Sequence, residues 1–327
     1  GAGAIGCYVG GALPCAGETV HFVGRPRVLE VLRTHGLRLS DLDGGRQQLP
    51  PQSLRLHDAV PTGLRPSLVL LCVKSAATAE AARALAGLPH GTPVLSLQNG
   101  LRNADTAAQH APELALLPGM VSFNVASPAP GHWHRGTGGV IAAQDHLALR
   151  PWVPRFAHAG LPLALHEDMR PVQWGKLLLN LNNPVNALSR LPLRAQLLDA
   201  GYRRVLAALV REALATMKAA RIRPARVGAA PPTLLPAILS LPTPLFRVVA
   251  ARMLRVDAQA SSSMADDVAA GRPTEIDALA GEVVRLAESV GRRAPLNERI
   301  AALLAQPSPP HMTAEALQAA LGLDQRP

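Results

Sequence analysis

Two short apolar runs in the first half of the chain constrain its fold more than any other feature. Residues 68–73 lead directly into Lys74, and residues 93–97 lead into Asn99 within a Gln-Asn-Gly triplet. Such runs are typical of strands in a parallel sheet that is covered on both faces. The carboxyl ends of parallel strands share the edge of the sheet where ligands bind, so we expect Lys74 and Asn99 at a common rim. The Asn-Gly pair is also an ordinary turn dipeptide.

The chain begins with a glycine motif of the form GxGxxG, and residues 7–13 can continue it as a close-packed helix. In dinucleotide-binding folds these glycines permit a tight turn and a close approach of backbone to a pyrophosphate above the helix N-terminus. The motif alone is weak evidence, because glycine and alanine are frequent in this chain. The strand that should precede the turn is absent from the sequence. We expect that a strand of about six apolar residues ahead of Gly1 would raise stability and cofactor affinity.

Residues 20–23 form the next apolar run, and Gly24 and Arg25 follow it. A second parallel strand of a dinucleotide-binding sheet ends beside the adenosine ribose. An acidic residue at that point suits NAD, whereas an arginine suits the 2′-phosphate of NADP. Arg25 therefore favours NADP, and the alternative is an ordinary exposed arginine.

The remaining patterns divide the chain into a strand-rich part and a helical part. Strand-like patterns cover residues 39–59 (a hairpin-like insertion), 117–127, 139–143 and 161–166. Helices are predicted over residues 174–188, 193–220, 232–240, 244–256, 276–290, 297–304 and 313–321. His132 and His134 alternate as on a hairpin with no third ligand nearby, which favours structure over a metal site. We therefore predict an α/β fold with a Rossmann-like dinucleotide-binding domain over residues 1–168 and an all-α domain over residues 169–327.

The composition narrows the classes of protein that fit. The 327 residues are 48% apolar and 17% charged, as in a folded protein, and no apolar run nears the roughly 20 residues that span a bilayer. The net charge of +10 comes from scattered arginines, and 3% aromatic residues leave few platforms for stacking bases, so nucleic acid is not an expected partner. Cys7, Cys15 and Cys72 are too few for a disulfide framework, and we expect buried free thiols in a cytoplasmic protein.

A polar stripe in a leucine-rich helix is the main candidate for chemistry. Lys176, Asn180 and Asn183 recur at helical spacing, so they share one face of the helix predicted over 174–188. Lysine is rare in this chain, which makes this one informative. A lysine between apolar walls is partly desolvated, so its pKa falls and it can give a proton to an oxygen that gains negative charge. The alternative is a solvated surface lysine beside capping asparagines.

Two further polar clusters lie in the helical part. Residues 261–267 fit a serine-capped helix start. Thr274 and Asp277 are three residues apart, as in a capping box. Capping does not require Glu275, which the same turn would project off the helix N-terminus.

Together these motifs resemble the 2-dehydropantoate 2-reductase (ketopantoate reductase) family. They are GAGAIG at 1–6, VKS at 73–75, QNG at 98–100, WGKLLLN with NNP within 174–184, SSM at 262–264 and GRPTEID at 271–277. Their order and spacing cover nearly the whole chain, and the last three are far more specific than the glycine motif. In the family the asparagine before proline commonly follows the lysine by eight residues. Here Asn183 follows Lys176 by seven, and Asn182 is the alternative.

The resemblance implies a Rossmann-like NADP-binding domain and an all-α domain like the C-terminal domain of 6-phosphogluconate dehydrogenase. It implies catalytic roles for Lys176 and Glu275. The implied substrate-binding residues are Asn180, Asn183, Ser263 and Asn99. The implied NADPH-binding residues are Gly1, Ala2, Gly3, Ala4, Ile5, Gly6, Arg25, Lys74, Asn99 and Glu275. It implies no metal.

The activity that the resemblance implies is the NADPH-dependent reduction of 2-dehydropantoate to (R)-pantoate, in pantothenate and coenzyme A biosynthesis. The expected partner is a small-molecule 2-keto acid, and the expected protein is a monomer or homodimer. One alternative is a related NADP-dependent reductase of another 2-keto acid or an imine. Another is a noncatalytic NADP-binding regulatory protein, against which the presence of Lys176 and Glu275 argues.

Overall fold

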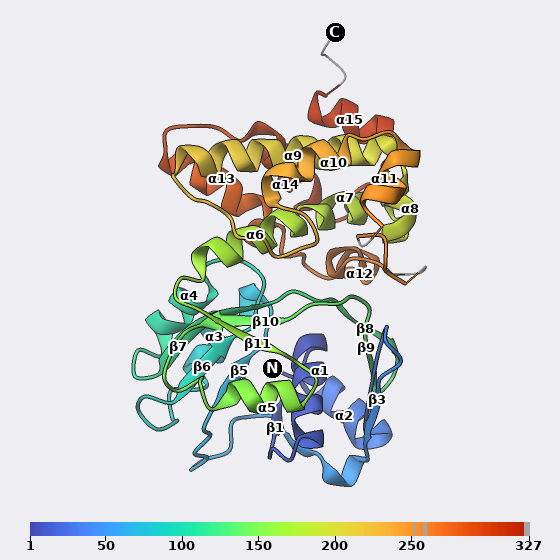
Figure 1. The fold of residues 1–327 in the computed structure, drawn as a ribbon. Helices are drawn as coiled ribbons and strands as arrows, with labels where there is room; N and C mark the ends of the chain where they lie inside the picture. The colour runs from blue at the N-terminus through green and yellow to red at the C-terminus, as the bar shows by residue number, and fades with distance from the viewer. Residues whose placement is uncertain (252, 258–259, 324–327) are drawn as a thin grey trace. The chain divides into compact units, whose positions relative to one another are not determined.

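The computed structural model of the protein describes residues 1–251, 253–257 and 260–323. The chain divides into two compact units, Gly1–Met169 and Arg170–Pro327. The first unit holds the sheets and the second is helical, which confirms the predicted α/β fold class with a Rossmann-like N-terminal part (Figure 1). Within the described residues, none of the helices combines the length and the apolar character that a membrane span requires.

The first unit is built on a five-stranded sheet. Its strands, in spatial order, are β11 (Leu163–His166), β10 (Ile141–Gln144), β7 (Ala115–Val121), β6 (Pro93–Ser96) and β5 (Val69–Leu71). Strands β5, β6 and β7 are parallel, and β10 is antiparallel to β7 but parallel to β11. The two apolar runs thus form neighbouring parallel strands, and their carboxyl ends lie at the same edge.

Helices cover this sheet on both faces because its strands alternate their side chains. Val94 of β6 packs in a core with α3 (Thr78–Arg83) and α4 (Asn103–His110). Leu95, the next residue, packs in a second core with α1 (Ala4–Cys15) and α5 (Trp152–His158). Successive residues of a strand face opposite sides, so one short strand contributes to both cores (Figure 1).

The remaining strands form two smaller sheets. Strand β1 (His21–Val23) pairs in parallel with β4 (Arg55–His57). The other sheet has the order β3 (Arg46–Leu49), β2 (Leu37–Asp41), β9 (His132–Arg135) and β8 (Val125–Ala129). Helix α2 (Pro26–His35) follows β1.

Two strand predictions need correction here. The hairpin-like insertion ends with β3, because β4 joins β1 in a different sheet. The single strand predicted over 117–127 is two strands, β7 and β8, which belong to different sheets. Strand propensity continues through this stretch, and only hydrogen-bond pairing shows where the chain leaves one sheet for the other.

The histidines and cysteines of this unit have structural surroundings. His132 and His134 flank Ser40, whose hydroxyl oxygen lies 2.7 Å from His132 Nε2 and 2.8 Å from His134 Nδ1. Cys7 is buried, and burial raises the pKa of its thiol to about 12. Cys15 is exposed, contrary to the expectation of a buried thiol, because it ends α1 where the helix leaves the core.

The second unit consists of helices. In chain order they are α6 (Arg170–Asn180), α7 (Asn182–Ser189), α8 (Leu193–Leu198), α9 (Ala200–Ala219), η3 (Pro232–Leu234), α10 (Leu235–Leu239), α11 (Thr243–Val249), α12 (Ser263–Ala269), η4 (Ile276–Ala278), α13 (Ala280–Ser289), α14 (Pro295–Leu304) and α15 (Ala314–Leu321). Three helices predicted as continuous are interrupted, at Leu181, Asp199 and Leu279. Asp199 caps α9 by accepting hydrogen bonds from the first turn, which ends α8 one residue earlier. The helix predicted over 244–256 ends at Val249.

A buried arginine joins several of these helices. Arg203 of α9 is completely buried, and its guanidinium lies 4.4 Å from the ring centroid of Phe246. Its guanidinium donates five hydrogen bonds, and the acceptors are Leu239 O, Leu197 O, Leu198 O, Leu241 O and Thr243 Oγ1. Arg203 therefore ties the end of α8 to the α10–α11 segment through backbone acceptors.

Candidate functional site

The glycine motif forms a tight turn in the first unit. Gly3 N donates to Gly1 O at 2.9 Å, and a side chain at Gly6 would place its Cβ 2.0 Å from that same oxygen. No residue larger than glycine fits at position 6 while this turn is kept. Gly3 precedes the first turn of α1 and is exposed, so the turn presents an open helix N-terminus.

The turn lies between the carboxyl ends of β1 and β5. Ala2 N donates to Val23 O, the last residue of β1, at 3.0 Å. Gly1 contacts Val73, where an added Cβ would lie 2.6 Å from Val73 Cγ1. Arg25 follows the first strand by two residues and Lys74 follows Val73, and both side chains are exposed. The fold therefore places one cation on each side of the glycine turn.

Asn99 belongs to the same edge of the sheet. Its carbonyl oxygen accepts a hydrogen bond from Ser75 Oγ at 3.2 Å, which joins the segments that follow β5 and β6. Asn103 Nδ2 donates to the same oxygen at 2.5 Å. Gly100 has a φ of 92°, so the Asn-Gly pair is also a turn that needs glycine. Asn99 therefore lies at the sheet edge that follows β5 and β6, and Asn99-Gly100 is also a turn.

Lys176 lies in the middle of α6 in the second unit. It is half-buried, and desolvation by burial lowers its pKa from 10.5 to about 8. Gly175, the residue before Lys176, lets another segment pack closely against α6. A Cβ at Gly175 would lie only 2.2 Å from Ala225 O. The backbone of residues 225–228 therefore lies directly on α6. This partial burial differs from the full exposure expected of a solvated surface lysine.

The asparagines after Lys176 do not all lie on one helix. Asn180 is buried at the end of α6, whereas Asn183 lies in α7 beyond the interruption at Leu181. The helix predicted over 174–188 is thus two consecutive helices, joined through Leu181, whose own backbone angles are helical. The Oδ1 of Asn182, the alternative to Asn183, is buried and has no hydrogen-bond partner among the described residues. Both residues therefore stay candidates for the substrate contact.

Ser263 is held beside α7 by its neighbour. Ser262 Oγ caps α12 by accepting from Ala265 N at 3.1 Å, as the serine-rich sequence predicted. Ser262 N donates to Asn186 Oδ1 at 2.8 Å, and this buried contact fixes α12 against α7. Ser263 itself is exposed in the first turn of α12. Asn186 is a residue that sequence reasoning missed, and its signal is a third amide at helical spacing after Asn183.

Glu275 occupies the position before η4 and is half-buried. The capping box predicted around it is wrong. η4 has no side-chain cap, and Asp277 instead binds Arg285 Nη1 at 2.7 Å. A nearby arginine is the stronger partner for the aspartate. The short helix η4 packs against α13 and α14.

Each unit thus gathers part of the predicted residues. In the first unit, the glycine turn, Arg25, Lys74 and Asn99 share the carboxyl edge of the strands. In the second, hydrogen bonds from Ser262 bring the start of α12, with Ser263, to α7, with Asn183. A Rossmann-like unit with an open glycine turn, followed by an all-helical unit, is an arrangement of dinucleotide-binding enzymes.

Comparison with known proteins agrees with this class. Residues 1–146 match the family model described as ketopantoate reductase PanE/ApbA, and residues 168–308 match its C-terminal model. The chain therefore belongs to the ketopantoate reductase family, a family of oxidoreductases.

Individual relatives are similar over nearly their full length. The 2-dehydropantoate 2-reductase of Halobacterium salinarum is 29% identical over 93% of this chain and 96% of its own. The 2-dehydropantoate 2-reductase of Pyrococcus horikoshii is 28% identical over 93% of this chain and 94% of its own. The crystal structure of a PanE/ApbA family ketopantoate reductase from Ralstonia eutropha JMP134 has a TM-score of 0.76 at 28% identity, covering 99% of this chain and 98% of that one.

Proposed function

We propose that this protein reduces 2-dehydropantoate to (R)-pantoate with NADPH, in pantothenate and coenzyme A biosynthesis. The observation that supports it most is Lys176, a half-buried lysine whose pKa is lowered to about 8 by desolvation. A group with a pKa near the working pH can give up its proton as the substrate oxygen becomes negative. The family membership and the similarity to proteins named 2-dehydropantoate 2-reductase supply the reaction class.

The first unit is proposed to bind the cofactor. The residues Gly1, Ala2, Gly3, Ala4, Ile5 and Gly6 are proposed to hold the pyrophosphate at the N-terminus of α1. Arg25 is exposed directly after β1, where its guanidinium can pair with a 2′-phosphate and favour NADPH over NADH. Lys74 and Asn99 lie at the same edge and complete the proposed contacts. When bound, NADPH supplies the hydride.

The second unit is proposed to bind the substrate and supply the proton. Lys176 protonates the carbonyl oxygen as it becomes an alkoxide. Glu275, together with Asn180 and Asn183, orients the substrate hydroxyl, and Glu275 also contacts the cofactor. Ser263 is exposed at the start of α12, where its hydroxyl can donate to the substrate carboxylate. Asn182 is the alternative to Asn183, because its Oδ1 has unused acceptor capacity among the described residues.

The test is NADPH oxidation by the purified protein, with 2-dehydropantoate and a panel of other 2-keto acids and cyclic imines. The expected result is turnover of 2-dehydropantoate, lost in Lys176→Ala and retained in Lys218→Ala, an exposed lysine on α9. Turnover of only another keto acid or only an imine would change the proposed substrate and leave the proposed reductase activity in place. Binding of NADPH without turnover of any compound would instead favour a noncatalytic regulator. The same preparation analysed by sedimentation would tell a monomer from a homodimer.

A further inference from the structure

Asn186 is a buried amide of α7 for which the proposed reaction has no direct use. Its side chain is completely buried, and both of its polar atoms have partners. Oδ1 accepts from Ser262 N at 2.8 Å, and Nδ2 donates to Leu191 O at 2.8 Å. An amide has an accepting end and a donating end, so these two partners fix its orientation. Asn186 therefore ties the start of α12 to the turn that follows α7.

The turn that follows α7 gives Asn186 a firm support. Arg190 ends α7 in the left-handed region, with a φ of 51°, and its N–H donates to Asn186 O at 3.1 Å. Ser189 Oγ donates to the same oxygen at 2.9 Å and accepts from Leu191 N at 3.2 Å. Leu191 O in turn receives the side-chain amide of Asn186. The backbone and the side chain of Asn186 are thus held together, so its Oδ1 is a fixed point on α7.

The start of α12 reaches this fixed point from a distant part of the sequence. Ser262 is the buried N-cap residue of α12, and its N–H donates to Asn186. Its hydroxyl donates to Asn183 O at 3.4 Å, which is a longer contact. Just before α12, Ala260 O accepts from Leu193 N at 2.8 Å at the start of α8. The segment that enters α12 is therefore attached to α7 and α8, and the bond to Asn186 is the short, buried link at the helix start.

Both proposed substrate contacts of this region depend on that link. Ser263 follows Ser262 directly and is exposed in the first turn of α12. Its Cα lies about 3.8 Å from that of Ser262, so a shift of the anchored residue also moves Ser263. Asn183 lies three residues before Asn186, which is about one turn of α7. The same part of α7 thus carries a proposed substrate amide and holds the proposed substrate serine.

We propose that Asn186 is a positioning residue of the substrate site, which holds α12 so that Ser263 meets the substrate carboxylate while the amide at the start of α7 meets the substrate hydroxyl. The proposal rests on the proposed reductase function, because it concerns the binding of the same substrate. A hydrogen bond to a charged group depends on exact placement of the donor. Loss of the Asn186 contact should therefore weaken substrate binding, whereas the proton of Lys176, on α6, does not pass through this contact.

Steady-state kinetics with 2-dehydropantoate and saturating NADPH test the proposal. Asn186→Leu has a similar size and no hydrogen-bonding group. It should raise KM about ten- to hundredfold, the worth of one hydrogen bond to a charged group, and change kcat far less. Asn186→Asp keeps an acceptor for Ser262 N, so its KM should stay close to that of the parent. If Asn186→Leu does not fold, Asn186→Ser, whose side chain is one atom shorter, takes its place with the same expected rise in KM.

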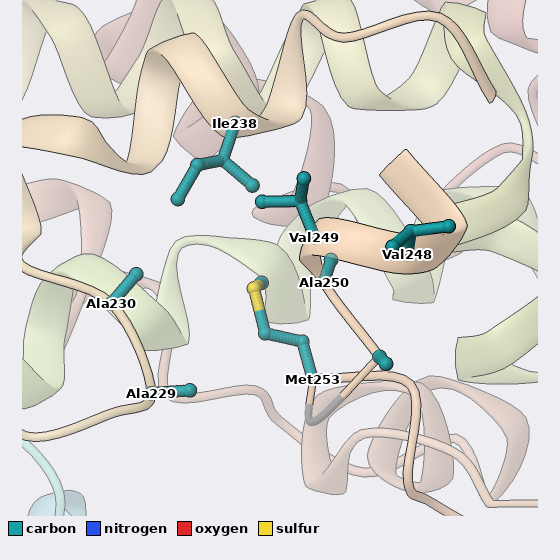
Figure 2. Close-up of a pocket in the computed structure, with 8 residues that line it drawn as sticks. Ala229, Ala230, Ile238, Val248, Val249, Ala250 and Met253 are labelled. Carbon is teal, nitrogen blue, oxygen red and sulfur yellow. The ribbon is translucent and has the colours of Figure 1, made fainter. Parts of the chain in front are cut away.

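A matched control separates this effect from a general loss of stability. Ile238 of α10 lines an apolar pocket of the same unit together with Val249 and Met253 (Figure 2). Helix α10 packs against α9 and α11. Ile238→Ala should therefore lower the stability of the unit without moving α12 on α7, and its KM should equal that of the parent.

A double variant shows whether Asn186 acts through Ser263. Ser263→Ala alone should raise KM by a factor similar to that of Asn186→Leu. The two changes remove the same substrate contact, so the double variant should have nearly the KM of either single variant. If the two factors multiply in the double variant, Asn186 acts independently of Ser263 and the proposal is wrong.

Failure of the positioning role and failure of the reductase give different results. The parent reduces 2-dehydropantoate, or another 2-keto acid with which the same variants are then measured, if the reductase proposal holds. An unchanged KM in Asn186→Leu, or an equal rise in Ile238→Ala, would then overturn the positioning role alone. Reduction of no 2-keto acid by the parent would overturn both proposals.

Discussion

Replacing Lys176 by methionine tests two consequences of its burial at once. Methionine has a similar length and no charge, so it keeps the contacts of the lysine stem with α6 and its neighbours. As the proposed proton donor, Lys176 should contribute a factor of about 100 to 10,000 to kcat, and Lys176→Met should lose this factor. NADPH affinity should be nearly unchanged, because Lys176 is not among the residues proposed to contact the cofactor.

The second consequence concerns stability. A pKa lowered from 10.5 to about 8 means that the folded protein holds the lysine proton less tightly than the unfolded chain. Below pH 8 the charged lysine therefore destabilises the fold, by on the order of 3 kcal/mol. Between pH 8 and 10.5 the unfolded state binds more protons, so stability rises with pH and this penalty disappears. Lys176→Met should thus be more stable than the parent at pH 7, and the difference should vanish near pH 10.5.

Denaturant unfolding at pH 7 and at alkaline pH measures the effect on stability. A pH profile of kcat measures the effect on catalysis. The parent rate should fall about tenfold per pH unit above pH 8, where the donor loses its proton. Lys218→Met is the matched control, because Lys218 is exposed on α9 and should show neither effect. If Lys176→Met has the parent kcat, or if its stability changes no more than that of the control, then Lys176 is a solvated helix residue and the mechanism has no proton donor.

Three further predictions concern other positions. Arg25→Asp should remove most of the preference for NADPH over NADH in cofactor titrations, and an unchanged preference would show that the 2′-phosphate binds elsewhere. Gly175→Ala should lower the thermal midpoint by several degrees through about 1–3 kcal/mol of steric strain against the segment that crosses α6, whereas Gly87→Ala, in open space, should not. Arg203→Met should cost at least about 3 kcal/mol in denaturant unfolding, because it leaves several buried carbonyls without donors. Arg204→Met, at the exposed neighbouring position, should cost little, and equal losses would contradict the role of Arg203.

The sequence predicted well those strands whose positions follow from burial alone. Residues 68–73 and 93–97 are apolar because helices cover both faces of β5 and β6, and that requirement is visible without any partner strand. The serine cap of α12 was equally predictable, because capping is a local hydrogen bond. Pairing was less predictable, since β7 and β8 form one uninterrupted pattern in sequence but belong to different sheets.

What the sequence indicated by itself is the class of protein, through the glycine motif at residues 1–6 and a rare lysine among leucines. The tertiary structure decided the rest. It interrupts the helix predicted over 174–188 at Leu181. It pairs Asp277 with Arg285 where the sequence predicted a helix cap, and it fixes α12 against α7 through Asn186. It also presses residues 225–228 onto α6. Each of these contacts joins residues distant in sequence or competes with a local alternative, so its energy depends on packing that periodicity does not encode.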